Sequence, residues 1–120
     1  MWVMTNSSFV SIVQHWDKPD IMVVRGRFLG DVANFLNLPL SAEKVTPDND
    51  YRFRIEATRD AVHAAVNRAV TMIDYGNFKN SCPPWRHAVY MGVWSVLHQA
   101  QRVALSGTKT WWKNLNRMVY

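Results

Sequence analysis

Seven consecutive residues, 51–57, alternate strictly between apolar and polar side chains, and this pattern constrains the fold more than any other feature of the sequence. Successive side chains of a β-strand point to opposite faces of the sheet. Tyr51 and Phe53 are therefore expected to face a core, and Arg52, Arg54 and Glu56 to face water. A strand with one covered face is typical of an antiparallel sheet.

Two earlier runs, Phe9–Gln14 and residues 21–27, are rich in β-branched residues, and the polar residues 17–20 between them favour a turn. Together they predict an antiparallel hairpin. Trp2–Met4 is expected to add a short strand in front of it. Residues 38–50 contain two prolines and three acids and are expected to form a loop.

Apolar residues spaced three and four positions apart predict two helices in the first two thirds of the chain. The first is expected to begin with Asp31 as its cap and to end before Pro39. The second is expected to begin after a cap at Thr58 or Asp60 and to run to about residue 74. Its apolar stripe consists of Val62, Ala65, Val66, Ala69, Val70 and Ile73.

A third and longer helix is predicted from residue 85 to about residue 105, with Ser81 or Cys82 as its cap and Pro83 and Pro84 in its first turn. This helix is apolar nearly all round, so it needs cover on two sides. One apolar face is lined by Trp85, Ala88, Val89, Gly92, Val96, Ala100 and Val103. Trp94 is expected to share another face with His87 and His98.

The order of these elements predicts an α+β domain of two layers, in which helices pack on one face of an antiparallel sheet of three or four strands. A length of 120 residues suits one domain, expected over residues 1–106. Hydrophobic residues make up 48% of the chain and charged residues 19%, which excludes intrinsic disorder. Residues 107–120 are expected to form a separate basic, aromatic segment, short enough to need a docking surface.

Charge is distributed unevenly along the chain. Residues 1–79 hold nine Lys/Arg and nine Asp/Glu, whereas residues 80–120 hold five Lys/Arg and no acid, so the whole net charge of +5 lies in the last third. This asymmetry favours a partner of negative potential, unless the excess serves solubility alone. The basic and aromatic candidates in the last segment are Lys109, Trp111, Trp112, Lys113 and Arg117.

No residue pattern predicts catalysis, a metal or a cofactor. Cys82, the single cysteine, lies at a predicted helix N-terminus with His87 five residues later, and either a Cys–His pair or a structural cysteine fits that placement. His87 and His98 share a helix but are about 16 Å apart along its axis, too far to bind one zinc ion. The five glycines never cluster into a phosphate-binding loop. We therefore expect a protein that is not an enzyme.

Several segments are distinctive together: Trp2-Val3 with Thr5, Phe9-Val10-Ser11-Ile12-Val13, Val24-Arg25-Gly26-Arg27, Asp50-Tyr51-Arg52-Phe53-Arg54, Asp74-Tyr75-Gly76-Asn77-Phe78-Lys79, His87-Ala88-Val89-Tyr90 and Val93-Trp94-Ser95-Val96-Leu97. They resemble a family of small uncharacterised bacterial proteins over roughly residues 1–100. The resemblance implies that family and a bacterial source, and it implies no catalytic residue because no activity is established for the family. Residues after about 101 lie outside the resemblance.

The sequence thus leads to a non-enzymatic interaction module that binds another protein or itself, for example as a homodimer through the C-terminal segment. Six tryptophans in 120 residues support this expectation, because tryptophan is enriched at interface hot spots. An inhibitor-like or immunity-like role is consistent with the small size. The alternative is a nucleic-acid-binding accessory protein that uses the basic last third and the outward Arg25, Arg27, Arg52 and Arg54.

A cytoplasmic location is expected. The single cysteine excludes a disulfide scaffold, and the first residues lack the basic and apolar regions of a signal peptide. No apolar run approaches the roughly 18 residues that span a bilayer.

Overall fold

The structure is a computed structural model, and it describes residues 1–106 and residue 113. The chain divides into two compact units, residues 1–76 and residues from 77 onward, and each is described by itself. The expected segment of residues 107–120 lies, apart from residue 113, outside the described residues. The domain boundary at residue 106 stays a prediction.

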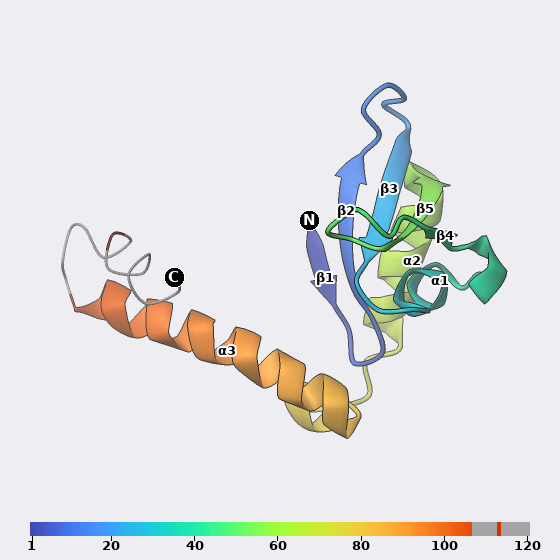
Figure 1. The fold of residues 1–120 in the computed structure, drawn as a ribbon. Coiled ribbons are helices and arrows are strands. Elements are labelled where there is room, and N and C mark those ends of the chain that lie inside the picture. The colour runs from blue at the N-terminus through green and yellow to red at the C-terminus, as the bar shows by residue number, and fades with distance from the viewer. Residues whose placement is uncertain (107–112, 114–120) are drawn as a thin grey trace. The chain divides into compact units, whose positions relative to one another are not determined.

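The first unit contains a sheet of five antiparallel strands: β1 (Trp2–Met4), β2 (Phe9–Gln14), β3 (Ile21–Gly26), β4 (Lys44–Val45) and β5 (Phe53–Thr58). Their order across the sheet is β1-β2-β3-β5-β4 (Figure 1). The α+β class, the hairpin and the short first strand are confirmed. The sheet has one strand more than expected, because β4 is two residues long and lies in the segment predicted to be a loop.

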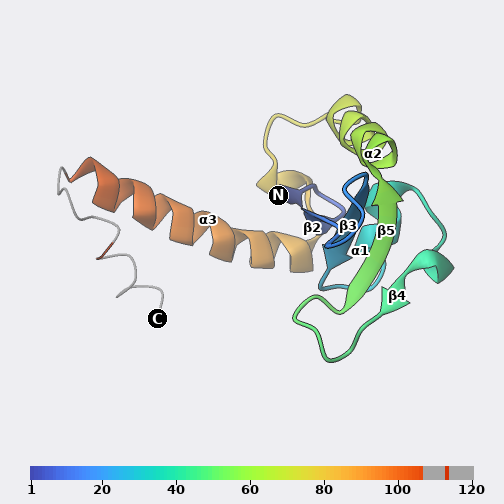
Figure 2. The ribbon, with the colours of Figure 1, turned by 90° about the horizontal axis from the view of Figure 1, so that it is seen from above.

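Two helices, α1 (Asp31–Leu36) and α2 (Arg59–Thr71), pack on one face of this sheet (Figure 2). The alternation of the strands turns Val10, Val24 and Ile55 toward these helices, and Val32 and Ala65 meet them from the helix side. Burying this apolar surface is the main favourable contribution to the stability of the unit.

The start of α2 agrees with the sequence prediction, whereas its end does not. Thr58, one of the two predicted caps, is the N-cap of α2, and its hydroxyl accepts the backbone N–H of Ala61 at 3.1 Å. The predicted stripe is wrong at its C-terminal end: α2 ends at Thr71, and Val70 and Ile73 are 63% and 52% exposed. The helix leaves the sheet before the periodic pattern of the sequence ends.

The N-terminus of α1 corrects the prediction that Asp31 caps it. Gly30 is the N-cap, with a φ of 92° that a residue with a side chain rarely adopts. The cap bonds come from Glu43, whose carboxylate accepts the backbone N–H groups of Gly30 at 3.1 Å and Ala33 at 3.0 Å. The carboxylate of Asp31 instead accepts the N–H of Phe9 at 2.9 Å, which ties the helix to β2.

The second unit contains α3 (Pro84–Leu105), preceded by a short 3-10 turn, η2 (Lys79–Ser81). Neither Ser81 nor Cys82 caps α3: the N-cap is Pro83, and both side chains donate to the carbonyl of Phe78 instead, at 2.6 and 3.4 Å. The ring of Phe78 stacks on Tyr90 with 5.6 Å between centroids, and this contact fixes η2 against the helix. A similar turn, η1 (Leu40–Ala42), lies in the first unit.

None of the helices in the described range is long and apolar enough to cross a membrane.

Candidate interaction surfaces

The face of the sheet opposite α1 and α2 carries two of the four predicted arginines, Arg25 and Arg54. Residues paired across antiparallel strands project to the same face. Arg25 of β3 is paired with Arg54 of β5, and Arg54 is paired in turn with Lys44 of β4. Three cationic side chains thus follow one another on three adjacent strands.

Tyr51 is buried, with 8% of its surface exposed, but it contacts arginines and is not part of the apolar cluster that the sequence predicts it to face. β5 begins only at Phe53, so the alternation does not extend to Tyr51, which lies in a bend before the strand. The guanidinium carbons of Arg25 and Arg27 lie over its ring, 4.4 and 4.3 Å from the centroid, within the range of a cation–π contact. The ring therefore joins Arg27 to the cluster that Arg25 and Arg54 form.

Arg52 is the predicted arginine that the structure does not bring into this cluster. It precedes β5 and is exposed, and its backbone carbonyl accepts the N–H of Thr46 at 2.7 Å. The alternation of residues 51–57 predicts that Arg52 faces the same side as Arg54. Because β5 begins only at Phe53, Arg52 lies outside the strand and the alternation does not apply to it.

Two acids of this unit, Glu56 and Asp31, contact other groups in the part of the chain that the structure describes. Glu56 lies 3.3 Å from the Nε2 atom of His15, and Asp31 accepts the N–H of Phe9. Arg25 donates one hydrogen bond to the hydroxyl of Ser11 at 2.7 Å. The Nε atoms of Arg25 and Arg54 are buried and have no hydrogen-bond partner among the described residues. The cluster retains positive charge and unused donors.

A second candidate surface is the apolar face of α3. Trp85, Val89 and Val96 are 48%, 41% and 48% exposed, although they lie on the face that the sequence predicts to be the most apolar. A Cβ atom at Gly92, in the middle of this face, would meet nothing within 4 Å. The described part of α3 therefore presents an open apolar face.

The second apolar side of α3 contains a local stack. The rings of Trp94 and His98 are 4.7 Å apart and nearly parallel, which confirms that they share a face. The ammonium of Lys79 lies 4.7 Å from the centre of the Trp94 ring. Trp94 is nevertheless 44% exposed.

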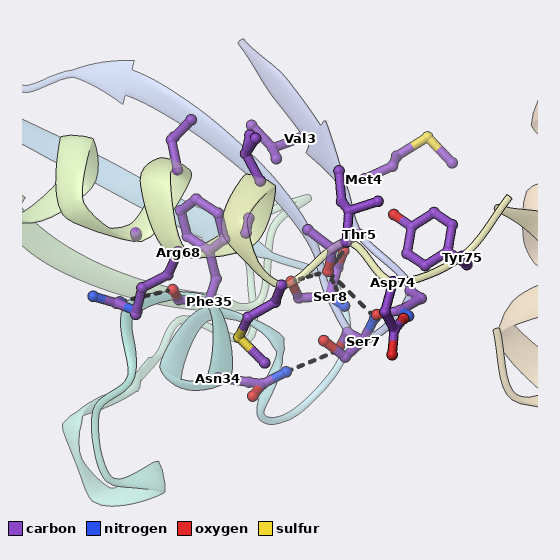
Figure 3. A pocket seen from close by; sticks show the side chains of 17 residues that line it. Val3, Met4, Thr5, Ser7, Ser8, Asn34, Phe35, Arg68, Asp74 and Tyr75 are labelled. Atoms are coloured by element: carbon purple, nitrogen blue, oxygen red, sulfur yellow. Dashed lines mark hydrogen bonds between the residues drawn. The ribbon is translucent and has the colours of Figure 1, made fainter. Parts of the chain in front are cut away.

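A pocket of about 390 Å³ lies between the turn that joins β1 to β2 and the two helices of the first unit (Figure 3). Its polar groups bond to one another: the amide of Asn34 donates to the carbonyl of Ser7 at 3.1 Å, and Arg68 donates to the carbonyl of Phe35 at 3.4 Å. Sequence reasoning missed this pocket because its walls come from segments far apart in the chain.

The candidates for chemistry do not assemble into a catalytic arrangement in the described range. Cys82 donates to the carbonyl of Phe78, and no hydrogen bond joins it to His87. Among the described residues, no group of three or more His, Cys, Asp or Glu side chains could hold a metal ion. Of the basic and aromatic tail candidates, Lys113 is described and exposed, and the others lie outside the described residues: Lys109, Trp111, Trp112 and Arg117.

These features define an α+β protein with a basic sheet face, an apolar helix face and no assembled catalytic group among its described residues. No protein-family model, curated protein sequence or solved structure matches the chain. The resemblance to a family of small bacterial proteins stays a prediction.

Proposed function

We propose that this protein is a non-enzymatic interaction module that pairs with a second copy of itself through the apolar face of α3. The observation that supports it is the exposure of Trp85, Val89 and Val96 on one side of this helix. Exposed apolar surface that is contiguous marks interaction sites, whereas apolar residues scattered singly do not.

The spacing of these residues suits a helix as the partner. Trp85, Val89, Gly92 and Val96 follow one another at intervals of four, three and four positions, which keeps them on one stripe when two helices pack side by side. Gly92 in the middle of the stripe lets a second backbone approach closely.

A second copy is the simplest helix of this kind. Each copy carries the same stripe, so a two-fold axis through its centre would cover both faces with one contact. The charged residues of α3 are Arg86 and Arg102, and Arg102 lies away from the stripe. The guanidinium of Arg86, a buried residue, lies 4.3 Å from the centre of the Trp85 ring at one end of the stripe, so neither arginine has to enter the middle of the contact.

The test is the mass of the protein in solution, measured by light scattering at low and high micromolar concentrations. We expect a dimer that dissociates on dilution. The double variant Val89→Glu with Val96→Glu places four carboxylates in the contact and is expected to be monomeric at every concentration. The matched control, Ser95→Glu with Gln101→Glu, adds the same charge to exposed positions off the stripe and is expected to stay dimeric.

A parent protein that stays monomeric at the highest concentration contradicts the proposal. Equal masses for the stripe variant and its control contradict it as well, because they would place the contact elsewhere. Helix content, measured by circular dichroism, shows whether each variant still folds.

A further inference from the structure

One row of side chains crosses, from edge to edge, the face of the sheet opposite α1 and α2. The pairing of the strands aligns one residue from each of them: Lys44 with Arg54, Arg54 with Arg25, Arg25 with Ser11, and Ser11 with Trp2. Since paired residues share a face, all five side chains project to the same side. Neighbouring strands are about 4.8 Å apart, so the row is about 19 Å long.

The two ends of this row differ in chemistry. Lys44, Arg54 and Arg25 form a cationic end, and Lys44 is exposed. Trp2 forms the other end with 66% of its surface exposed, and its ring meets Phe9 edge to face, with 5.7 Å between centroids. The hydroxyl of Ser11 lies between the two ends.

Among the described residues, the cationic end places like charges side by side, and no ion pair joins them to a carboxylate. Like charges placed directly opposite each other on neighbouring strands destabilise a sheet, and Arg25 and Arg54 are placed in this way. Tyr51 lies against Arg25, but it offers no negative charge. The Nε donors of both arginines are buried and have no hydrogen-bond partner in the described part of the chain, which adds to the cost of this placement.

We propose that this row binds single-stranded nucleic acid, with phosphates on Lys44, Arg54 and Arg25 and a base stacked on Trp2. Arginine donates two parallel hydrogen bonds to a phosphate, and an exposed indole accepts any base on its face. A cationic track beside an aromatic platform is the arrangement by which single strands are bound without sequence preference. This function is additional to pairing through α3 and uses a different unit of the chain.

An acidic polypeptide is the competing ligand, and the row distinguishes the two. Carboxylates would occupy the arginines equally well, but an acidic chain has no planar group that needs Trp2. The contribution of Trp2 to affinity therefore separates nucleic acid from acidic protein.

The test measures fluorescence anisotropy of labelled oligothymidylate and oligouridylate with the full chain over a series of salt concentrations. We expect binding that weakens as salt rises. Trp2→Ala is expected to lower the affinity roughly 5- to 100-fold through the lost stack. Arg54→Gln is expected to reduce the slope of the logarithm of affinity against that of salt by about 1. Lys18→Gln, which removes an exposed charge from a turn, is the matched control and is expected to change little.

Folding is checked separately by the urea midpoint of each variant. If Arg54→Gln lowers it, Lys44→Gln at an exposed position replaces it in the same measurement. Preference between the two oligonucleotides tells DNA from RNA, and either preference supports the site.

No binding of either oligonucleotide at low salt overturns the proposal. Equal affinities for Trp2→Ala and the parent also overturn it, as does polyglutamate that binds as tightly as the oligonucleotides. Those results would assign the row to an acidic polypeptide or to no ligand.

Discussion

Gly26 is the residue at which the packing of the sheet against α1 can be tested most directly. A Cβ atom built on Gly26 would lie 2.9 Å from the Cγ2 atom of Val32. Two carbon atoms in contact prefer a separation of about 3.5–4.0 Å. The other neighbours of that Cβ, in Asp31 and Phe9, lie at 3.7 and 3.8 Å and accept it without movement.

The cost of Gly26→Ala follows from the ways in which this overlap can be relieved. Val32 is completely buried and β-branched, so its side chain has few other conformations. The bonds from α1 to Glu43 and Phe9 oppose a shift of the whole helix. Overpacking of this kind costs about 1–3 kcal/mol of unfolding free energy.

Urea unfolding followed by circular dichroism is the assay. A loss of this size lowers the midpoint by roughly 1 M at an ordinary m-value. Gly76→Ala is the control, because a Cβ there meets nothing within 4 Å, and we expect no loss. In a Val32→Ala background the overlap is absent, so Gly26→Ala should then cost much less. A parent-like midpoint for Gly26→Ala, or an unchanged cost in that background, would refute the reasoning.

Three further predictions concern single contacts. Glu43→Ala should destabilise the first unit by about 1–3 kcal/mol in urea unfolding, since two N–H groups lose a charged acceptor, whereas Asp48→Ala in an exposed part of the same segment should cost little. Thr58→Ala should cost about 1 kcal/mol in the same assay through the lost cap of α2. His15 should carry its proton on Nε2, because Nδ1 accepts two backbone N–H groups at 3.1 Å and Nε2 faces Glu56. The nitrogen NMR shifts of the ring test this, and an Nδ1–H signal would contradict it.

The regular periodicity of apolar residues along the chain predicts most of the fold correctly. The β-branched runs and the alternation after residue 52 predict β2, β3 and β5 because burial of one face selects those residues. The errors fall where a distant residue decides a local structure. Gly30 and Glu43 together form the start of α1 across 13 positions, and no local pattern shows that bond.

The candidate surface was predicted less completely than the fold. The outward direction of Arg54 follows from alternation, but the pairing of Arg54 with Arg25 depends on strand register, which periodicity alone leaves open. Trp2 illustrates the same limit. Its place in the row follows from its pairing with Ser11 of β2, and β2 is itself separated from the β5 strand of Arg54 by β3. The contacts of Tyr51 were predicted wrongly because the alternation was extended to two residues before the start of β5 at Phe53.

Net charge along the chain concealed this basic face, and the reason lies in what the acids contact. Residues 1–79 are neutral in sum, so an argument from composition places every excess cation in the last third. The carboxylates of Asp31 and Glu43, however, accept backbone N–H groups around α1, and Glu56 faces His15. Acids engaged in this way hold the fold together, and among the described residues no ion pair joins Arg25 or Arg54 to a carboxylate. A segment of zero net charge therefore carries three cations side by side on one face of the sheet, and the position of the acids decides where a polyanion could bind.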